Sequence, residues 1–446
     1  MAAEARTVKP PPLQFADPSL EPTFLPDHDL SRRAVVTGVG AITPIGNDHP
    51  TFWKNLVAGV SGAGPITTFD ASEFDVKIAA EVKDFDPTTV MDRKMARRMS
   101  RFIHFAMAAG KEAVADAGLD FSEWSPERRD RVAVAVNTGG GGIEQVVIGG
   151  EVLEARGPGQ VSPFAFPALS ASMAACQLSM EYGLTGPVIT QSAACATSII
   201  CFHDALRMIQ RGDVDVVLAG GTEAPLLPMG FAALGNMHAL SRRNDEPEKA
   251  SRPFDKNRDG FVYGEGAGVV VVESAEHALR RGATIQAEVI GTAMTADAFH
   301  ISAPEPTGRG ASMAMTKAMA DAGVAPTEID LIVAHGTSTS LNDLTETRAI
   351  KSAFGGHAHK VSISAPKSMV GHMIGAAGIV SALAAIGAIR EGVIAPTINL
   401  DEPDLPELDL DYTPLVARQK RVDTAIINGF GFGGQNAVAV FRRFEE

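Results

Sequence analysis

The sequence predicts an α/β protein in which two copies of one structural unit pack in layers. Apolar, β-branched stretches alternate with Ala-rich helical stretches along most of the chain, which is typical of α/β layers. An internal repeat relates residues 112–142 to residues 317–340, because each reads as a helix ending in ADAG, a loop, an apolar strand and a turn of small residues. A looser repeat relates residues 195–221 to residues 371–399. The helical stretch SALAAIGAI is apolar on nearly every side, so we expect a buried helical layer between two sheets.

The pattern along the chain divides it into three regions. Residues 1–31 are Pro-rich and lack periodicity, and we interpret them as an N-terminal arm on the surface. The stretch RRAVVTGVGAITPIG then predicts a buried strand closed by a turn. Together with the repeat, this predicts an N-terminal half over residues 32–285 and a C-terminal half over residues 286–446. The interface between two such halves is a natural place for a site.

The bulk composition excludes several classes of function. The chain has 446 residues and a formal net charge of −14, so its overall field opposes nucleic acid or an anionic membrane as a partner. Its three cysteines have no CxxC spacing, which argues against a disulfide framework and fits a reducing, cytoplasmic compartment. We expect no membrane span, because no apolar run is long enough, and no signal peptide, because the N-terminus has no apolar core segment. Its acidic residues argue against a transit peptide.

Three motifs with reactive side chains fall at corresponding places in the repeat. AACATS places Cys195 at the start of a helical stretch, AHGTSTS places His335 after a strand, and GHMIGAAG places His372 at the start of another helical stretch. A helix N-terminus lowers a thiol pKa, and a thiolate forms thioesters readily. Two imidazoles and the backbone N–H of Cys195 can donate hydrogen bonds to charge developing on a thioester carbonyl. Each residue alone also fits a buried structural role, so the prediction rests on the set.

Two other motifs have a composition typical of ligand-binding sites, but we interpret both as structural. The Gly-rich stretch NTGGGG, residues 137–142, has the composition of a phosphate cradle but lacks the GK[ST] ending of a P-loop. His357 and His359 have metal-like spacing but no Cys or acidic partner nearby, so a surface loop is the better interpretation and we expect no metal site.

The ordered motifs make the chain resemble the β-ketoacyl-ACP synthases, more narrowly the synthase II type of bacterial fatty-acid synthesis. The resemblance spans residues 32–443 and rests on RRAVVTGVGAITPIG, AACATS, AGGTE, SRRNDEPEKASRPFDKNRDGFVYGEGAG, AHGTSTSLNDLTET, APKSMVGHMIGAAG and NGFGFGGQN. It implies a thiolase-like five-layer αβαβα fold from two duplicated halves, usually as a homodimer. It also implies an acyltransferase of fatty-acid elongation that condenses a cysteine-bound acyl chain with malonyl-ACP to give 3-oxoacyl-ACP and CO2, with no cofactor.

The resemblance assigns roles to the residues already singled out. Cys195 matches the nucleophile that takes the acyl chain from acyl carrier protein (ACP). His335 and His372 match the pair that holds the malonyl thioester and promotes its decarboxylation. Phe432 matches a gate residue, and its N–H with that of Cys195 would form the oxyanion hole, with Phe430 beside it.

One position beside the predicted site departs from the family pattern. Lys367 matches the lysine that organises the His372 side, and the family usually has a Glu nine residues after that histidine to support the lysine. Here that residue is Ser381, and we expect Asp343 or Glu346 to compensate. The departure leaves open a ketosynthase of a specialised lipid or polyketide pathway, or a chain-length partner subunit, although such subunits lack the nucleophile.

Two further enzyme classes fit less well. A thiolase-type acyl-CoA enzyme uses a second cysteine near the C-terminus as a base, and this chain has no cysteine after Cys201. A cysteine hydrolase needs an Asn or Asp that orients its base, and Gly/Ala-lined surroundings suit an acyl chain better than a peptide.

A basic stretch predicts the surface that meets the carrier protein. RKMARRMSR places four cations at helical spacing i, i+3, i+4 and i+7, namely Lys94, Arg97, Arg98 and Arg101. This basic segment is an exception in a chain of negative net charge, and it resembles the segment that docks acidic ACP in the family. An ordinary solvated helix face is the alternative.

Overall fold

The computed structural model describes Asp29 and residues 32–446, so the predicted arm over residues 1–31 lies outside the described residues apart from Asp29. Ten strands form the main sheet. Its N-terminal strands are β1 (Ala34–Ile42), β4 (Val132–Asn137), β5 (Val188–Ile189), β6 (Val216–Glu223) and β7 (Gly266–Ser274). Its C-terminal strands are β8 (Ala287–Ala296), β9 (Leu331–Val333), β10 (Ser362–Ser364), β13 (Thr424–Gly431) and β14 (Gln435–Arg442).

The strand order repeats between the two sets of strands. The sheet runs β10-β9-β13-β14-β8-β1-β7-β6-β4-β5, so each set reads first, fifth, fourth, second, third when followed outward from the centre. The parallel and antiparallel pairings also match, with β4–β6 parallel like β9–β13 and β6–β7 antiparallel like β13–β14. The sets join through an antiparallel pairing of β1 with β8 over residues 34–36. The division of the chain at residue 285 stays a prediction.

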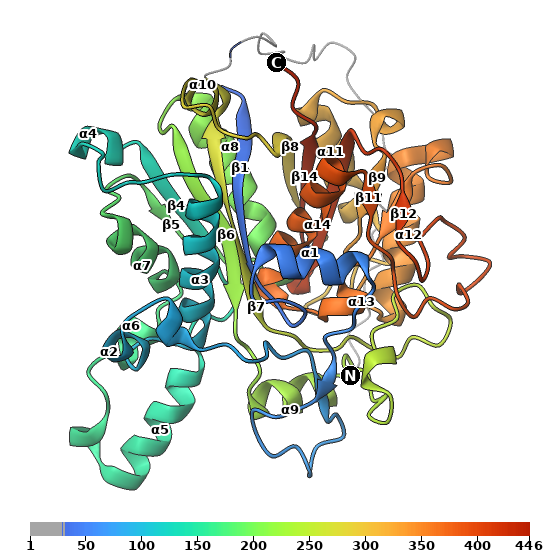
Figure 1. Ribbon diagram of the computed structural model, residues 1–446. Helices are drawn as coiled ribbons and strands as arrows, with labels where there is room; N and C mark the ends of the chain where they lie inside the picture. The colour runs from blue at the N-terminus through green and yellow to red at the C-terminus, as the bar shows by residue number, and fades with distance from the viewer. Residues whose placement is uncertain (1–28, 30–31) are drawn as a thin grey trace, which may run out of the picture.

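Helices form three layers around the two sets of strands, as Figure 1 shows. The middle layer contains α8 (Ile200–Arg211) and α14 (Ala377–Glu391), and the outer layers contain α3 (Arg101–Asp116) with α7 (Met173–Tyr182), and α11 (Arg309–Ala322) with α12 (Ser340–Phe354). Alternate side chains of β6 explain the layering, because Val217 and Ala219 join the middle core while Val216 and Leu218 join the outer one. This five-layer arrangement confirms the predicted fold class.

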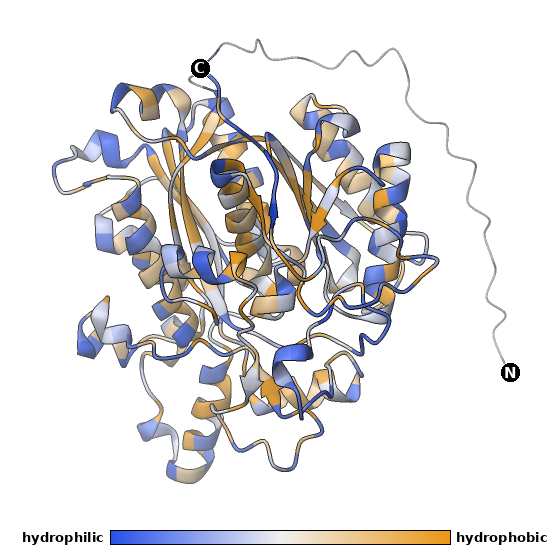
Figure 2. Ribbon diagram, turned by 45° about the vertical axis from the view of Figure 1, so that its right-hand side comes forward, coloured by the Kyte–Doolittle hydropathy of each residue, from blue (hydrophilic) through white to orange (hydrophobic). Residues whose placement is uncertain are grey.

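The remaining α-helices and β-strands of the described chain lie outside these layers and the main sheet. They are α1 (His49–Val57), α2 (Arg93–Ala96), α4 (Pro126–Arg129), α5 (Glu144–Arg156), α6 (Ala165–Leu169), α9 (Pro228–Asn236), α10 (Ala275–Arg280), α13 (Lys367–Val370), β2 (Gly64–Pro65), β3 (Ile78–Ala79), β11 (Val393–Ile394) and β12 (Arg418–Gln419). Figure 2 shows apolar residues concentrated in the strands and central helices, with hydrophilic residues on the outer faces.

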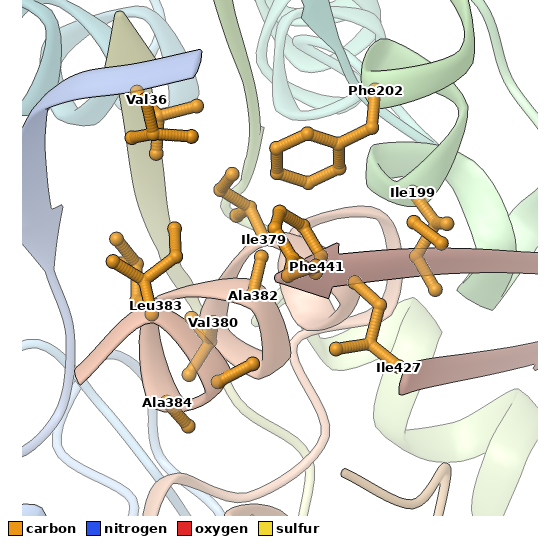
Figure 3. Packing of buried hydrophobic residues seen from close by; sticks show 14 of the residues in the cluster. Val36, Ile199, Phe202, Ile379, Val380, Ala382, Leu383, Ala384, Ile427 and Phe441 are labelled. Carbon is orange, nitrogen blue, oxygen red and sulfur yellow. The ribbon is translucent and has the colours of Figure 1, made fainter. Parts of the chain in front are cut away.

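The middle helix α14 is buried along its length, as its composition predicted. Every residue from Ala377 to Ile389 is buried, and Ile379 and Leu383 pack beside Val36 of β1 (Figure 3). Among the described residues, Ile374–Glu391 is the one helical segment with the length and hydropathy of a membrane span, and 83% of it is buried inside the protein. The segment therefore has the burial of a core helix.

The repeated ADAG sequence has the same structural role in both halves. Asp116 accepts the N–H of Val39 in β1 at 2.9 Å, and Asp321 accepts the N–H of Thr292 in β8 at 2.8 Å. β1 and β8 pair with each other only over residues 34–36 of β1, so beyond that point the edge of each strand that faces the other lacks a strand partner, and the aspartates bond these N–H groups. The repeat read from the sequence thus marks equivalent contacts between helix and strand.

Candidate active site

Cys195 lies in a tight turn that leads into the middle helix α8. It belongs to the 3₁₀ helix η3 (Ala194–Ile199), and Ala194 before it has a left-handed φ of 49°. The Thr197 hydroxyl accepts the N–H of Ala193 at 2.8 Å, and the Ser198 hydroxyl accepts an N–H of α14 at 2.9 Å. The small and hydroxylated residues of AACATS therefore hold the turn against both middle helices, and Cys195 is only 4% exposed.

The structure brings the two predicted histidines to this thiol. His335 follows β9 and His372 follows α13, yet reactive atoms of both lie within 4.8 Å of one another and of the Cys195 sulfur. The two imidazole ring centres are 5.4 Å apart and nearly perpendicular. Both Nδ1 atoms are buried with no hydrogen-bond partner among the described residues. Three segments separated in sequence thus form one compact Cys–His–His cluster.

Burial dominates the electrostatics of the thiol. It raises the pKa of Cys195 to about 11, although Lys367 and the N–H groups of Phe432 and Cys195 act to lower it. The expectation that a helix N-terminus lowers this pKa is therefore wrong for the resting protein, because the thiol sits in a buried 3₁₀ turn ahead of α8. At neutral pH Cys195 is a thiol, and a neighbouring base must take its proton when it reacts.

The imidazoles and Lys367 complement that thiol. Burial, then the charge of Lys367, lowers the pKa of His335 and of His372 well below 6.5, so both rings are neutral at neutral pH. Burial lowers the pKa of Lys367 to about 8, while Glu346 is the strongest of the anions that act to raise it. The site therefore combines a protonated thiol, two neutral imidazoles and one cationic ammonium.

Glu346 fixes the turn that carries His335. Its two carboxylate oxygens accept the N–H of His335 at 2.8 Å and the N–H of Gly336 at 2.7 Å. The Asn428 side-chain amide donates to it at 3.0 Å, a contact that the sequence did not predict. Burial raises the pKa of Glu346, and these donors together with Lys367 oppose that rise. Glu346 is thus both a support for His335 and the main counter-charge of Lys367.

Asp343 supports the same region, while Ser381 takes no part in the charge balance. Asp343 accepts the N–H groups of Phe254 at 2.8 Å and Ser338 at 3.2 Å, and burial raises its pKa to about 6. The Ser381 hydroxyl donates to a carbonyl one turn back in its own helix at 3.3 Å. The anions that act on Lys367 therefore come from α12 and not from the position where the family usually has Glu.

A cavity of about 280 Å³ opens onto the cluster. Cys195, His335 and His372 line it together with Phe430 and Phe432. The Phe430 ring lies 5.7 Å from the His335 ring, between ring centres. Phe432 stands at the β13–β14 turn in η8 (Phe432–Gly434), whose two glycines have positive φ angles of 78° and 72°. The structure thus places both predicted gate residues at the cavity, on a turn that needs glycine.

The four predicted docking cations do not share one helix face. The helix α2 ends at Ala96 and α3 begins at Arg101, so the expected single helix is broken between them. Arg101 forms an ion pair with Glu265 at 2.7 Å, and the half-buried Arg98 lies over the ring of Phe164 at 4.2 Å. The remaining two of the four are exposed, namely Lys94 and Arg97.

Metal ligation is the other chemistry that the cluster offers. Among the residues the structure describes, Cys195, His335 and His372 form the one group with three closely spaced metal-type ligand atoms. The charge of Lys367 acts on all three, which opposes a divalent cation there. His357 instead bonds the backbone carbonyl of Ile329 at 3.1 Å. The cluster fits proton and thioester chemistry better than metal binding.

A buried Cys–His–His cluster at the seam of two matching α/β halves defines a thiolase-like condensing enzyme. The chain belongs to the β-ketoacyl synthase family, since the N-terminal domain of that family matches residues 31–278 and its C-terminal domain matches residues 286–401.

Individual relatives agree with this membership. The chain is 47% identical over 414 residues to 3-oxoacyl-[acyl-carrier-protein] synthase 2 of Synechocystis sp., covering 93% of this chain and 99% of that relative. The solved ishigamide ketosynthase/chain length factor is 36% identical with a TM-score of 0.86, covering 93% of this chain and all (100%) of that one. The ketosynthase of the AntDE:AntF complex, solved with a type II polyketide acyl-carrier protein, is 31% identical with a TM-score of 0.83, again over 93% and 100% of the two chains.

Proposed function

We propose that this chain catalyses the decarboxylating condensation of an acyl chain with malonyl-ACP, giving 3-oxoacyl-ACP and CO2 in fatty-acid elongation. The observation that carries the proposal is the buried cluster of Cys195, His335 and His372, whose reactive atoms lie within 4.8 Å of one another at the base of a cavity. The names of the relatives, which are 3-oxoacyl-ACP synthases, support the same reaction.

Acyl transfer to Cys195 is the first step. The sulfur attacks the thioester carbonyl of acyl-ACP while its proton passes to a neutral imidazole of the cluster. The N–H groups of Cys195 and Phe432, which already approach the sulfur, would hold the oxyanion. The ACP thiolate then leaves and takes the proton from the imidazole, so the acyl chain remains on Cys195 and the site returns to its starting charge.

Decarboxylation of malonyl-ACP is the second step. His335 and His372 would each donate one N–H to the malonyl thioester oxygen, which takes up the electron pair released when CO2 departs. The resulting carbanion attacks the acyl carbonyl on Cys195, a C–C bond forms and the C–S bond breaks. Burial, together with the charge of Lys367, keeps both imidazoles neutral, and Lys367 stabilises the departing thiolate until it is reprotonated. The reaction needs no cofactor, because loss of CO2 generates the nucleophile.

We also propose ACP as the partner that delivers both substrates. Lys94 and Arg97 are the exposed cations of the predicted docking segment, and the AntDE:AntF ketosynthase was solved with its carrier protein. Exposed ion pairs contribute about 0–1 kcal/mol each, so docking would be weak and sensitive to salt. Charge reversal at both residues should raise the KM for ACP substrates severalfold and leave kcat nearly unchanged. An unchanged KM would remove this surface from the proposal.

A cytoplasmic homodimer is the proposed assembly, with residues 32–285 and 286–446 as the two halves of each subunit. The helix α5 has no buried residue and projects from the body of the molecule (Figure 1). Large apolar side chains are exposed on α5, α6, α7 and β5, namely Val146, Ile148, Leu153, Phe166, Met180 and Val188. An apolar face of this kind is typical of a subunit interface. Sedimentation of the purified chain as a monomer would contradict the proposal.

Covalent labelling tests the reaction. Radiolabelled acyl-ACP should label the wild-type chain on Cys195, while Cys195→Ala should take no label and lose condensation by at least about a thousandfold. Cys195→Gln is the matched control, because it should still decarboxylate malonyl-ACP without condensing. Mass spectrometry of products from a series of acyl-ACP primers would separate fatty-acid elongation from a specialised pathway. A chain that takes no label would contradict the proposed function.

A further inference from the structure

A second buried carboxylate lies across the seam between the two halves. Glu223 ends β6 and is 1% exposed. It accepts the N–H groups of Gly139 at 2.7 Å, Gly140 at 2.9 Å and Gly375 at 3.0 Å, and the Thr138 hydroxyl donates to it at 3.2 Å. Every one of these partners is a donor, which is the pattern expected around an ionised carboxylate. The Gly-rich NTGGGG turn thus binds an internal carboxylate.

The packing around this carboxylate admits no extra atom. A Cβ on Gly375 would overlap the Glu223 carboxylate and lie 2.5 Å from the Gly139 nitrogen. A Cβ on Gly139 would lie 2.7 Å from the same carboxylate. Two turns from different halves of the chain therefore meet through Glu223, and glycine at both positions allows the close approach.

Both turns lead directly to the reactive cluster. Gly375 follows His372 by three residues and lies in the 3₁₀ turn directly before α14. The carbonyl of Gly139 accepts the hydroxyl of Ser192 at 3.2 Å, and Ser192 precedes Cys195 by three residues. One carboxylate therefore connects the segment that carries the thiol with the segment that carries the second imidazole.

We propose that Glu223 is a positioning residue, which fixes the His372 segment against the Cys195 segment and so sets the geometry in which the two react. The roles of Cys195 and His372 in this inference rest on the proposed function. The negative charge of Glu223 also acts on the thiol and raises its pKa, after the larger effect of burial. The other titratable groups around that thiol are Lys367, Tyr263, His335 and His372.

The variant Glu223→Gln tests this role, because it keeps the volume and removes the charge. The amide nitrogen cannot accept, so at least one of the four donors loses its partner. We expect kcat for condensation and for malonyl decarboxylation to fall by about tenfold or more, with a smaller change in KM. The pH midpoint of iodoacetamide alkylation at Cys195 should fall by about half a unit or more, because an anion has been removed.

The alkylation measurement needs no substrate. Peptide mass spectrometry separates Cys195 from Cys176 and Cys201, so the midpoint can be read even in a chain that condenses nothing. Failure of the proposed function would then appear as missing condensation in the wild type, whereas failure of this inference would appear as an unchanged kcat together with an unmoved alkylation midpoint in the variant.

Glu273→Gln is the matched control. Glu273 is also fully buried, but it pairs with Val216 at the opposite end of the β6–β7 pairing and contacts Thr37, His277 and Arg281. This variant should be less stable than the wild type, but the pH midpoint of Cys195 alkylation should be unchanged. Wild-type kcat and midpoint in folded Glu223→Gln would overturn the inference, as would an equal change of midpoint in the control. Should Glu223→Gln not fold, Thr138→Val removes one donor to Glu223 together with the acceptor of the Gly141 N–H. Wild-type kcat together with a wild-type alkylation midpoint in that variant would overturn the inference.

Discussion

The turn that carries Cys195 and the turn that carries Gly375 occupy equivalent places in the two halves. The first borders a cavity, whereas the Glu223 carboxylate fills the space beside the second. A 3₁₀ turn with a left-handed residue enters each middle helix, at Ala194 (φ 49°) before α8 and at Ile374 (φ 42°) before α14. The residue that follows is Cys195 in the first case and Gly375 in the second. Duplication therefore supplied two similar frames, and side chains decided which became reactive.

The neighbouring strands extend this comparison. Beside Cys195, the turn after β9 supplies His335 and the end of β13 supplies Gly431, which lies against the Cys195 nitrogen. Beside Gly375, the turn after β4 supplies Gly139 and the end of β6 supplies Glu223. The Glu223 carboxylate thus fills the space beside Gly375, whereas the space beside Cys195 is open to the cavity. We call the surroundings of Gly375 the filled frame and the surroundings of Cys195 the open frame. The filled frame joins the two halves through Glu223, and the open frame is where we propose that the chemistry takes place.

The largest expected effect comes from the open frame. His372→Ala should lower malonyl decarboxylation by about 10²–10³-fold, because it removes one of two donors to the developing oxyanion. The release of CO2 from labelled malonyl-ACP measures this. The assay is best made in the Cys195→Gln background, where decarboxylation is separated from acyl transfer. Undiminished CO2 release would mean that the imidazole is not an oxyanion donor.

The filled frame can be broken by a single methyl group. Gly375→Ala should lower the free energy of unfolding by about 1–3 kcal/mol, because the new Cβ overlaps the Glu223 carboxylate and the backbone of Gly139. Urea titration measures this. Gly235→Ala is the control, since it lies in α9 with open space around a Cβ and should be neutral or slightly stabilising. Equal stabilities for the two variants would contradict the tight packing of the filled frame.

The charge balance of the open frame predicts a shift in pH dependence. Glu346 raises the pKa of Lys367, which is about 8, and the lysine is cationic below that value. Removing the anion with Glu346→Gln should lower this pKa, so activity should decline at a lower pH on the alkaline side. The shift should be about one unit, which is equivalent to about 1.4 kcal/mol. A pH profile of kcat measures it, and a shift to higher pH would contradict Glu346 as the counter-charge.

The smallest expected effect distinguishes the two ADAG helices. Glu112 precedes the first ADAG, where the second half has Lys317, and burial raises the pKa of Glu112 to about 7. A folded-state pKa above the unfolded value of 4.5 means that its stabilising contribution is present below pH 4.5 and is lost as the pH rises through about 7. Glu112→Gln should flatten this pH dependence by on the order of 1 kcal/mol after screening by solvent. Denaturant titrations at pH 5 and pH 8 provide the measurement, with Lys317→Gln as the control that keeps the slope.

The sequence predicted features that recur along the chain, and it did not predict features that depend on contacts between residues far apart in the chain. The layered α/β fold and the buried α14 follow from periodicity, and the structure confirms both. Motif order singled out Cys195, His335 and His372, which the structure brings together, while their catalytic roles stay predictions. The raised pKa of Cys195 and the role of Glu223 depend on segments far apart in the chain meeting at one point. The AGGTE motif was visible, but nothing in its spacing pointed to Gly375 as a partner. The break before Arg101 also carries no Gly or Pro signal.

The burial of α14 from Ala377 to Ile389 has a consequence for whether the second half can fold alone. This helix packs against β6, β7 and η3 of the first half as well as β9, β13 and β14 of the second. A C-terminal half made alone would leave the most apolar segment of the described chain partly uncovered, with the hydropathy of a membrane span. We therefore expect truncation between the halves to yield insoluble protein.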